Sequence, residues 1–125
     1  MRRTVLKSKI HGARLTGAHL EYEGSISVDR RLLDAAELVP FEKVQVVNEA
    51  NGARLETYVI EAAEGGGEVC LNGPAARLGY AGDRILLLSY AELEEDELAA
   101  HRPLVVHVDE RNQPVGPQLR SGRGG

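Results

Sequence analysis

Residues Lys43 to Ala62 read KVQVVNEANGARLETYVIEA, in which two strand-like runs flank the pair Asn51-Gly52. Valine, isoleucine, threonine and tyrosine favour strands. Asn-Gly is among the strongest short hairpin signals, because both residues tolerate a positive φ. The stretch therefore predicts a β-hairpin with strands over residues 43–48 and 53–62.

Short strands and turns continue on both sides of this hairpin. Gly65-Gly66-Gly67 and Asn72-Gly73-Pro74 mark two further turns. The run from Ile85 to Leu88 is uninterrupted and apolar, which is typical of a strand buried on both faces. We expect strands over residues 3–10, 27–29, 68–71, 84–90 and 104–108.

Helices are few and short in this pattern. Asp29 is placed to cap a helix over residues 30–38, which Pro40 ends. A helical turn is expected at residues 75–78, and a short acidic helix at 92–100. Strands joined by short turns, with too few helices for βαβ units, predict a mainly β fold, a small mixed barrel with a few short helices.

The composition fits one globular domain. A chain of 125 residues has the length of a single domain, which we place at residues 1–110. Residues 114–125 are rich in glycine, proline and arginine, so we expect a disordered tail there. Aromatic residues make up only 4% of the chain, so the core must be aliphatic.

The charge of the chain and its cysteine content indicate which partners and which cellular compartment suit it. The net charge is −4, from 15 basic and 19 acidic residues, and the absence of a long basic block argues against nucleic acid. The basic run from Met1 to Lys9 is not followed by an apolar segment, so we expect neither a signal peptide nor contact with a membrane. Cys70 is the single cysteine, and its place in Glu-Val-Cys-Leu indicates a buried strand residue. A cytoplasmic location fits these features.

The stretch from Tyr22 to Ser27, YEGSIS, is by itself an ordinary polar turn. Its context changes that interpretation, because several pieces recur in a fixed order and spacing from about residue 3 to about residue 108. These pieces are LKSKIH at 6–11, LEYEGSI at 20–26, LDAA at 33–36, NGAR at 51–54, TY at 57–58, NGPAA at 72–76 and GD at 82–83. Together they resemble the family of pyruvoyl-dependent aspartate decarboxylases.

The resemblance implies a double-psi β-barrel that assembles as a homotetramer with active sites between subunits. It implies decarboxylation of L-aspartate to β-alanine and CO2 for pantothenate synthesis. Loss of an α-carboxylate leaves an electron pair that no ordinary side chain accepts, so a carbonyl cofactor is required. In this family the carbonyl is a pyruvoyl group made from the residue matching Ser25, and neither pyridoxal phosphate nor a metal is expected.

The resemblance also implies that the chain cuts itself between Gly24 and Ser25, into a β chain of residues 1–24 and an α chain of residues 25–125. The Ser25 hydroxyl would attack the Gly24 carbonyl, and elimination from the resulting ester would free the two chains. Glycine can take a strained turn that brings these groups together, and proximity is the main driver. Spontaneous cleavage and cleavage assisted by a maturation factor both stay open.

Four residues match positions that serve substrate turnover or binding in the family. Tyr58 matches the proton donor, and a tyrosine hydroxyl carries its proton at neutral pH. The guanidinium of Arg54 suits the carboxylate that remains after decarboxylation. Lys9 matches a second cationic contact, and Thr57 a contact near the pyruvoyl group.

The stretch Asn72-Gly73-Pro74-Ala75 matches the family's substrate-binding turn, with Asn72 in a supporting role. Backbone N–H groups of Gly73 and Ala75, near a helix start, can hold a carboxylate or an oxyanion. Pro74 has no N–H group, so any backbone donor at that position is lost.

The spacing within the second hairpin strand raises a geometric question. Arg54 and Tyr58 share one strand face but lie about 13 Å apart along an ideal strand, which is longer than aspartate. Thr57 points to the opposite face. Either the strand bends, or Arg54 and Tyr58 serve sites in different subunits.

The four histidines, His11, His19, His101 and His107, show no metal-ligand spacing, so we expect no metal site. His11, together with Tyr22, flanks the site in the resemblance and is assigned a supporting role.

Two other interpretations stay open. The first is a pyruvoyl decarboxylase of another acidic amino acid, such as L-glutamate. The second belongs to a different class: a barrel-type binding or assembly module that never cleaves. Carbon dioxide release from the two amino acids tests the first, and an intact mass with an unmodified Ser25 would favour the second.

Overall fold

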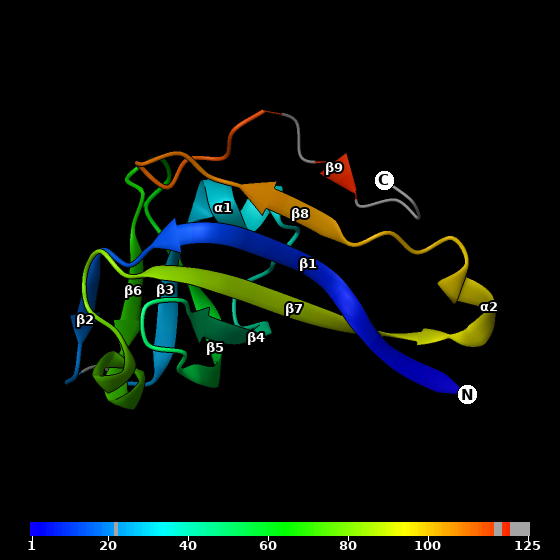
Figure 1. Cartoon of the computed structure of the whole chain (residues 1–125), viewed down its shortest axis with the longest axis horizontal. Coiled ribbons are helices and arrows are strands. Elements are labelled where there is room, and N and C mark those ends of the chain that lie inside the picture. Colours follow the sequence, from blue (N-terminus) through cyan, green and yellow to red (C-terminus); the bar gives the residue numbers. More distant parts are fainter. Residues whose placement is uncertain (22, 117–118, 121–125) are drawn as a thin grey trace.

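The computed structural model describes residues 1–21, 23–116 and 119–120, and Figure 1 shows the arrangement of the elements. The strands are β1 Arg2–Arg14, β2 Gly17–His19, β3 Ser25–Asp29, β4 Lys43–Asn48, β5 Arg54–Ala62, β6 Val69–Asn72, β7 Arg84–Glu94, β8 Leu104–His107 and β9 Leu119–Arg120. The helices are short: α1 Arg30–Ala35, the 3-10 helix η1 Gly73–Leu78, and α2 Glu95–Leu98.

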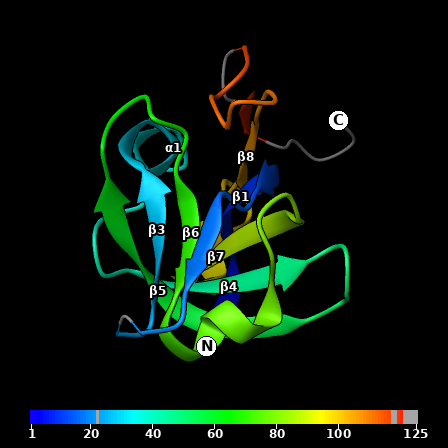
Figure 2. The same cartoon turned by 90° about the vertical axis from the view of Figure 1, so that its left-hand side faces the viewer.

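The strands of the described residues form one mixed sheet, in the order β2-β6-β3-β5-β4-β7-β1-β8-β9. β2 follows β1 in the sequence after a short link. In the sheet, however, β6, β3, β5, β4 and β7 lie between these two strands. The sheet must therefore curl so that its two ends approach each other, and the Thr16 N–H group, which donates to the Val69 carbonyl at 2.7 Å, extends the pairing of β2 with β6. Figure 2 shows β3 and β6 crossing the direction of β4. The expected mainly β fold is confirmed, and rolling of this kind is what a barrel requires.

The core inside the roll is aliphatic, as the scarcity of aromatic residues predicts. On β3 the buried side chains alternate between the core residues Ile26 and Val28 and the polar residues that face away from them. Burying each large aliphatic side chain contributes about 1.5–3 kcal/mol. The largest fully buried side chains include Ile10, Leu15, Ile26, Leu32, Leu71, Ile85 and Val59.

The hairpin predicted around Asn51-Gly52 is present, with β4 and β5 paired antiparallel from Lys43↔Tyr58 to Val47↔Arg54. Gly52 has a φ of 74°, as a hairpin glycine should. Asn51 contributes through its side chain instead, because its Oδ1 accepts the N–H group of Ala53 at 2.8 Å.

The prediction that β7 is buried on both faces is wrong. Ile85 and Leu87 point into the core, whereas Leu86 and Leu88 are half-buried on the outer face of the sheet. In the described chain α2 is a helix that lies against β7, and it does so at the far end of the strand. An uninterrupted apolar run therefore marks an outer sheet face left partly open in a single protomer.

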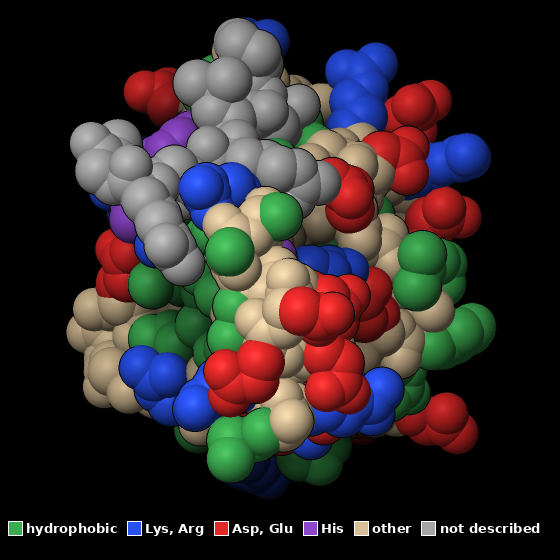
Figure 3. Space-filling view, turned by 90° about the vertical axis from the view of Figure 1, so that its right-hand side faces the viewer, with side chains coloured by type: hydrophobic (Ala, Val, Ile, Leu, Met, Phe, Trp, Pro, Cys, Tyr) green, Lys and Arg blue, Asp and Glu red, His purple; other side chains and the backbone are tan. Residues whose placement is uncertain are grey.

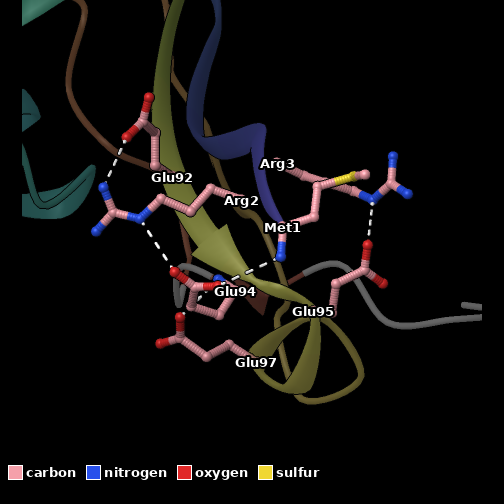
Figure 4. A network of polar contacts seen from close by, with 7 residues as sticks. All are labelled: Met1, Arg2, Arg3, Glu92, Glu94, Glu95 and Glu97. Atoms are coloured by element: carbon pink, nitrogen blue, oxygen red, sulfur yellow. Dashed lines mark hydrogen bonds and ion pairs between the residues drawn. The ribbon is translucent and has the colours of Figure 1, made fainter.

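The acidic stretch 92–100, expected to be a helix, is also different in the structure. β7 continues to Glu94, and α2 covers only Glu95–Leu98. The reason is long-range pairing, because the start of β1 extends as a ladder partner along β7. Arg2 Nε lies 3.2 Å from Glu94 Oε1, and Arg3 Nε lies 3.1 Å from Glu95 Oε1 (Figure 4).

These ion pairs are exposed and contribute roughly 0–1 kcal/mol each, so the backbone ladder decides the conformation. The N–H group of Glu94 then donates to the Glu97 carboxylate at 2.8 Å, which completes a capping box for the short helix. Figure 3 shows acidic and basic side chains interspersed over this end of the molecule.

Asp29 caps α1 as predicted: its side chain accepts the Arg31 N–H group at 2.9 Å. The helix nevertheless ends at Ala35 instead of Leu38. Glu37 takes a φ of 57°, a left-handed conformation that ends the helix before Pro40 is reached.

The end of the chain is partly described. Pro114 forms a β-bridge with Val108, and β9 pairs antiparallel with β8. The rest of the stretch 114–125 expected to be disordered lies outside the described residues, apart from Val115 and Gly116. Among the described helices, none has the length and apolar character needed to cross a bilayer.

Cys70 is a buried strand residue, as predicted. Burial raises the pKa of its thiol, the nearby charge of Glu68 adds to this effect, and a hydrogen bond to the backbone of His19 opposes it.

Candidate active site

A cavity of about 620 Å³ opens on the outer face of β3, β5 and β6 and contains three of the predicted site residues, Ser25, Tyr58 and Asn72. The strand alternation that sends Ile26 and Val28 into the core places Ser25 and Ser27 on the cavity side. The described lining consists of His19, Glu23, Ser25, Ser27, Phe41, Tyr58, Ile60, Glu68 and Asn72.

Ser25 is the first residue of β3 and is only 4% exposed. It lies directly opposite Asn72 in the antiparallel pairing of β3 with β6. The side-chain amide of Asn72 donates to Ser25 Oγ at 2.9 Å and to Ser27 Oγ at 2.9 Å. Asn72 is therefore more central than its expected supporting role suggested, because it directly contacts the hydroxyl oxygen of Ser25.

Tyr58 reaches the cavity from β5, which runs parallel to β3 with Ile26 opposite Val59. Its side chain is half-buried and faces the cavity together with Ile60, two residues further along the same strand face. The ring of Phe41 lies beside it, with 6.3 Å between the ring centroids.

Gly24 lies just before β3, at the position where a strained turn is expected. Gly24 forms a bend, and its φ lies outside the left-handed region that favours glycine. A Cβ atom built on Gly24 would meet nothing within 4 Å. Tyr22, given a supporting role from the sequence, lies outside the described residues.

The two predicted cations lie away from this cavity in the protomer. Arg54 is exposed at the start of β5, where Nη1 donates to Gln45 Oε1 at 3.1 Å. Lys9 is half-buried on β1, opposite Leu88 of β7. The described lining of the cavity contains two carboxylates and neither lysine nor arginine. Within one protomer, none of these lining residues is a lysine or arginine that could pair with a substrate carboxylate.

The remaining predicted contacts also lie outside the described cavity lining. Thr57 is half-buried on the core side of β5, opposite Val44. Gly73, Pro74 and Ala75 form the start of η1, with Gly73 buried at a φ of 70° and Pro74 in its first turn, where a missing N–H group is tolerated.

His11 is exposed on β1 beside the ring of His107, with 5.5 Å between the ring centroids. The described residues contain no group of three or more side chains suited to a metal ion.

Hydrogen bonds from the hairpin hold η1 in place beside Asn72. The amide of Asn48 donates to the Leu78 carbonyl at 3.0 Å and to Asp83 Oδ2 at 2.9 Å, and the amide of Asn51 donates to the same carbonyl at 3.1 Å. The hydrogen bonds of Asp83 to Asn48 and to the backbone of Tyr80 lower its pKa. The Asn-Gly hairpin thus fixes the C-terminal end of η1, the helix that begins within the predicted substrate-binding turn.

Several lining residues were not singled out from the sequence. Ser27 and Ile60 follow Ser25 and Tyr58 by two positions, so strand alternation alone would have found them. Phe41 and Glu68 belong to other segments, and only the folded arrangement brings them to the cavity.

A family model described as aspartate decarboxylase matches residues 1–115. The chain belongs to the aspartate decarboxylase family. It is 59% identical over 115 residues to aspartate 1-decarboxylase 2 of Gloeobacter violaceus, covering 92% of each chain. It is 49% identical over 121 residues to the aspartate 1-decarboxylase of Syntrophobacter fumaroxidans, covering 97% of this chain and 98% of the relative. The enzyme of the same name from Salinibacter ruber is 57% identical over 109 residues, 87% of this chain and 75% of its own.

The membership in this family confirms the resemblance seen in the sequence. Within this aspartate decarboxylase, the structure brings together Ser25, Tyr58 and Asn72 from three neighbouring strands. It leaves Arg54 and Lys9 on a different part of the same outer sheet face.

Proposed function

We propose that this chain decarboxylates L-aspartate to β-alanine and CO2, with a pyruvoyl group made from its own Ser25. The product would supply pantothenate and coenzyme A synthesis in the cytoplasm. The observation that carries the proposal is the position of Ser25, buried at the start of β3, hydrogen-bonded to Asn72 and sharing a cavity with Tyr58.

The first step is cleavage at Gly24. Ser25 Oγ attacks the Gly24 carbonyl carbon, and the amide nitrogen of Ser25 leaves that carbon as the ester forms. Loss of the Ser25 α-proton then expels the Gly24 carboxylate and leaves a dehydroalanine. Addition of water and loss of ammonia convert this residue to pyruvoyl, so atoms balance without an outside oxidant. Asn72 supports the first step, because its amide holds the attacking oxygen in one place.

The residues around Ser25 also fit the finished group. The Asn72 amide, which donates to Ser25 Oγ at 2.9 Å, would be free to donate to a carbonyl oxygen once Oγ has left with Gly24. Ser27 and Asn72 give this end of the cavity a polar lining. When formed, the pyruvoyl group supplies the electron-accepting carbonyl that decarboxylation requires.

Tyr58 would supply the proton that replaces the lost carboxylate at the substrate Cα. Its side chain lies on the cavity face of β5, next to the strand that carries Ser25. A tyrosine hydroxyl is a hydrogen-bond donor and can serve as a general acid.

Arg54 and Lys9 would bind the substrate carboxylates from a second copy of the chain. Both residues lie on the outer face of the sheet, in the same cross-strand rows as the half-buried apolar residues Leu86 and Leu88. A neighbouring copy that covers this face would bury the apolar residues and bring cations to a cavity whose own described charges are acidic. We therefore propose a homotetramer with shared sites, to which Thr57, Gly73, Pro74, Ala75, His11 and Tyr22 contribute supporting contacts.

Intact mass spectrometry tests this function most directly. Wild-type protein expressed alone should give two chains that meet between Gly24 and Ser25, with the larger chain lacking an amino-terminal amine. The Ser25→Ala variant should give one uncut chain. Only the wild type should release CO2 from L-aspartate, and release from L-glutamate in the same assay should be much slower.

A wild-type protein that stays uncut yet active would contradict the proposal. A wild-type protein that is cut only in the presence of cell extract would instead assign the cleavage step to an assisting factor, with the same final group.

A further inference from the structure

Phe41 is the single phenylalanine of the chain, and 75% of its surface is exposed. It lines the Ser25 cavity beside Tyr58, with 6.3 Å between the ring centroids and 44° between the ring planes. An exposed apolar side chain alone needs no explanation. At this position, however, the ring contributes nothing to the core and has the proposed proton donor as its aromatic neighbour.

The backbone of Phe41 is a second, independent observation. Its φ is 73°, in the left-handed region where the Cβ atom of an ordinary residue crowds the backbone. Glycine or asparagine would adopt this conformation at lower cost. The chain therefore keeps a strained, exposed aromatic residue where a small residue would serve the loop better, as is typical of functional sites.

Hydrogen bonds fix the segment that carries the ring. The Phe41 N–H group donates to the Val59 carbonyl at 2.7 Å, and the Val59 N–H group donates to the Glu42 carbonyl at 3.1 Å. Lys7 Nζ then holds the Glu42 carboxylate at 2.7 Å. Because Val59 is the next residue after Tyr58 in β5, both rings are positioned from the same strand.

We propose that Phe41 is a positioning residue for Tyr58, which holds the tyrosine ring toward the cavity and covers that side of it against water. The proposal rests on the function proposed above. Inclined aromatic pairs are favourable arrangements that restrict ring orientation, and a slightly misplaced reacting group loses rate steeply. Since the ring acts through Tyr58 and leaves the substrate contacts unchanged, its loss should lower kcat more than it raises KM.

Substitutions at Phe41 separate the ring from the backbone strain. Phe41→Gly removes both, Phe41→Leu keeps the strain without the ring, and Phe41→Tyr keeps both. We expect kcat per pyruvoyl group to fall about threefold to tenfold in the glycine and leucine variants, and to stay near wild type in Phe41→Tyr. Phe41→Gly should nevertheless unfold at a higher temperature than the wild type, because it relieves the strain. Val39→Ala is the matched control, since Val39 is 62% exposed in the same loop and does not line the cavity.

A second readout needs no pyruvoyl group. In the uncut Ser25→Ala protein, selective labelling of the one phenylalanine and four tyrosines should show a ring-to-ring NMR contact between Phe41 and Tyr58. The Tyr58 ring signals should shift in Phe41→Gly and stay in place in Val39→Ala.

Wild-type kcat in Phe41→Gly, or unmoved Tyr58 signals, would overturn the positioning role. A changed oligomeric mass in that variant would also overturn it, by assigning the ring to a subunit contact. Failure of the underlying function looks different, because the wild type itself would then lack the pyruvoyl group.

Discussion

Asp29 shows how one carboxylate can join three segments of this chain. It is fully buried, and its two oxygens accept the N–H groups of Arg31 at 2.9 Å, Gly65 at 3.0 Å and Gly67 at 2.7 Å, as well as the side-chain amide of Gln113 at 3.0 Å. Burial raises the pKa of this carboxyl, but the hydrogen bonds from Gln113 and the three backbone groups outweigh burial, so its pKa lies below the ordinary value.

A lowered pKa in the folded state means that folding favours the ionised form. The resulting stability is fully present above the unfolded pKa of about 4 and is lost as the pH falls through the lower folded value. We expect Asp29→Asn to lower the free energy of unfolding at pH 7 by about 2–4 kcal/mol, because it leaves buried donors poorly paired. Urea titrations from pH 7 down to pH 2 should also show a weaker acid dependence than the wild type.

Asp34→Asn is the control for this change, since Asp34 lies exposed on the same helix. It should alter stability by no more than about 0.5 kcal/mol. Equal losses in the two variants would mean that the four hydrogen bonds of Asp29 contribute nothing specific.

At the scale of single residues, local roles were predictable and distant partners were not. The cap formed by Asp29 follows from the two residues after it, whereas its partners near residues 65 and 113 come from remote segments. Asn72 matched a family turn in the sequence, but its contact with Ser25 depends on the pairing of β3 with β6. The register of that pairing is a property of the whole sheet.

Among the elements, the Gly65-Gly66-Gly67 turn is clamped by the segment after β8. Gly67 is buried with a φ of 74°, and a Cβ atom there would lie 2.3 Å from the carbonyl oxygen of Arg111. The side-chain amide of Asn112 also donates to the Gly67 carbonyl at 2.9 Å. The backbone of Gly67 therefore lies directly against the backbone of Arg111, with no room for a side chain at position 67.

The two neighbouring glycines of this turn make a matched pair of substitutions. Gly67→Ala should lower the free energy of unfolding by about 2–4 kcal/mol, because it adds a left-handed alanine and a clash with rigid backbone. Gly66→Ala should change it by less than about 1 kcal/mol, since its Cβ would meet its first neighbour at 3.7 Å. Thermal or urea unfolding measures both free energies. Comparable losses in the two variants would contradict a close backbone contact specific to Gly67.

Element boundaries in the sequence were reliable where the signal was local. The strand predicted over residues 43–48 is β4, and the hairpin turn lies where Asn51-Gly52 places it. Residues 92–94 have the composition of a helix start, yet they extend β7 because β1 supplies a ladder partner. Composition cannot show which distant strand will lie alongside.

At the scale of the whole molecule, Arg54 and Tyr58 are expected to serve one site from two different subunits. Two variants that are each inactive alone should therefore restore activity when they are mixed in one assembly. Tyr58→Phe and Arg54→Ala should each be nearly inactive alone. Mixed assemblies of the two variants, made by co-expression, should regain activity at roughly one site in four by random assortment, because some sites then combine an intact Tyr58 with an intact Arg54 from the neighbour. Activity per pyruvoyl group in purified mixtures measures the effect.

Ser25 and Tyr58 supply the control, since both line one cavity of one protomer. A mixture of Ser25→Ala with Tyr58→Phe should stay inactive, because no single cavity regains both groups. An inactive mixture of Tyr58→Phe with Arg54→Ala would place Arg54 and Tyr58 in the same site of one chain.

The sequence predicted how residues along one strand are arranged at the site, but not which distant segments meet there. Alternation along β5 correctly placed Arg54 and Tyr58 on one face and indicated that they are too far apart for one substrate. It could not show that the cavity lining around Tyr58 would be acidic, because Glu23 and Glu68 reach it from two separate segments.

The proposed cut lies between β2 and β3, so it separates β1 and β2 from the rest of the sheet. The piece ending at Gly24 would own β1, an inner strand hydrogen-bonded to β7 on one side and β8 on the other. Once the peptide bond is gone, β1 stays in the sheet through noncovalent contacts alone, which are its hydrogen bonds to β7 and β8 and the burial of Ile10 and Ala13 in the core. A denatured mature enzyme would then be two separate molecules whose reunion depends on concentration, whereas the precursor folds as one. Refolding of the cut enzyme should therefore become less efficient as the protein is diluted, whereas refolding of the precursor should not.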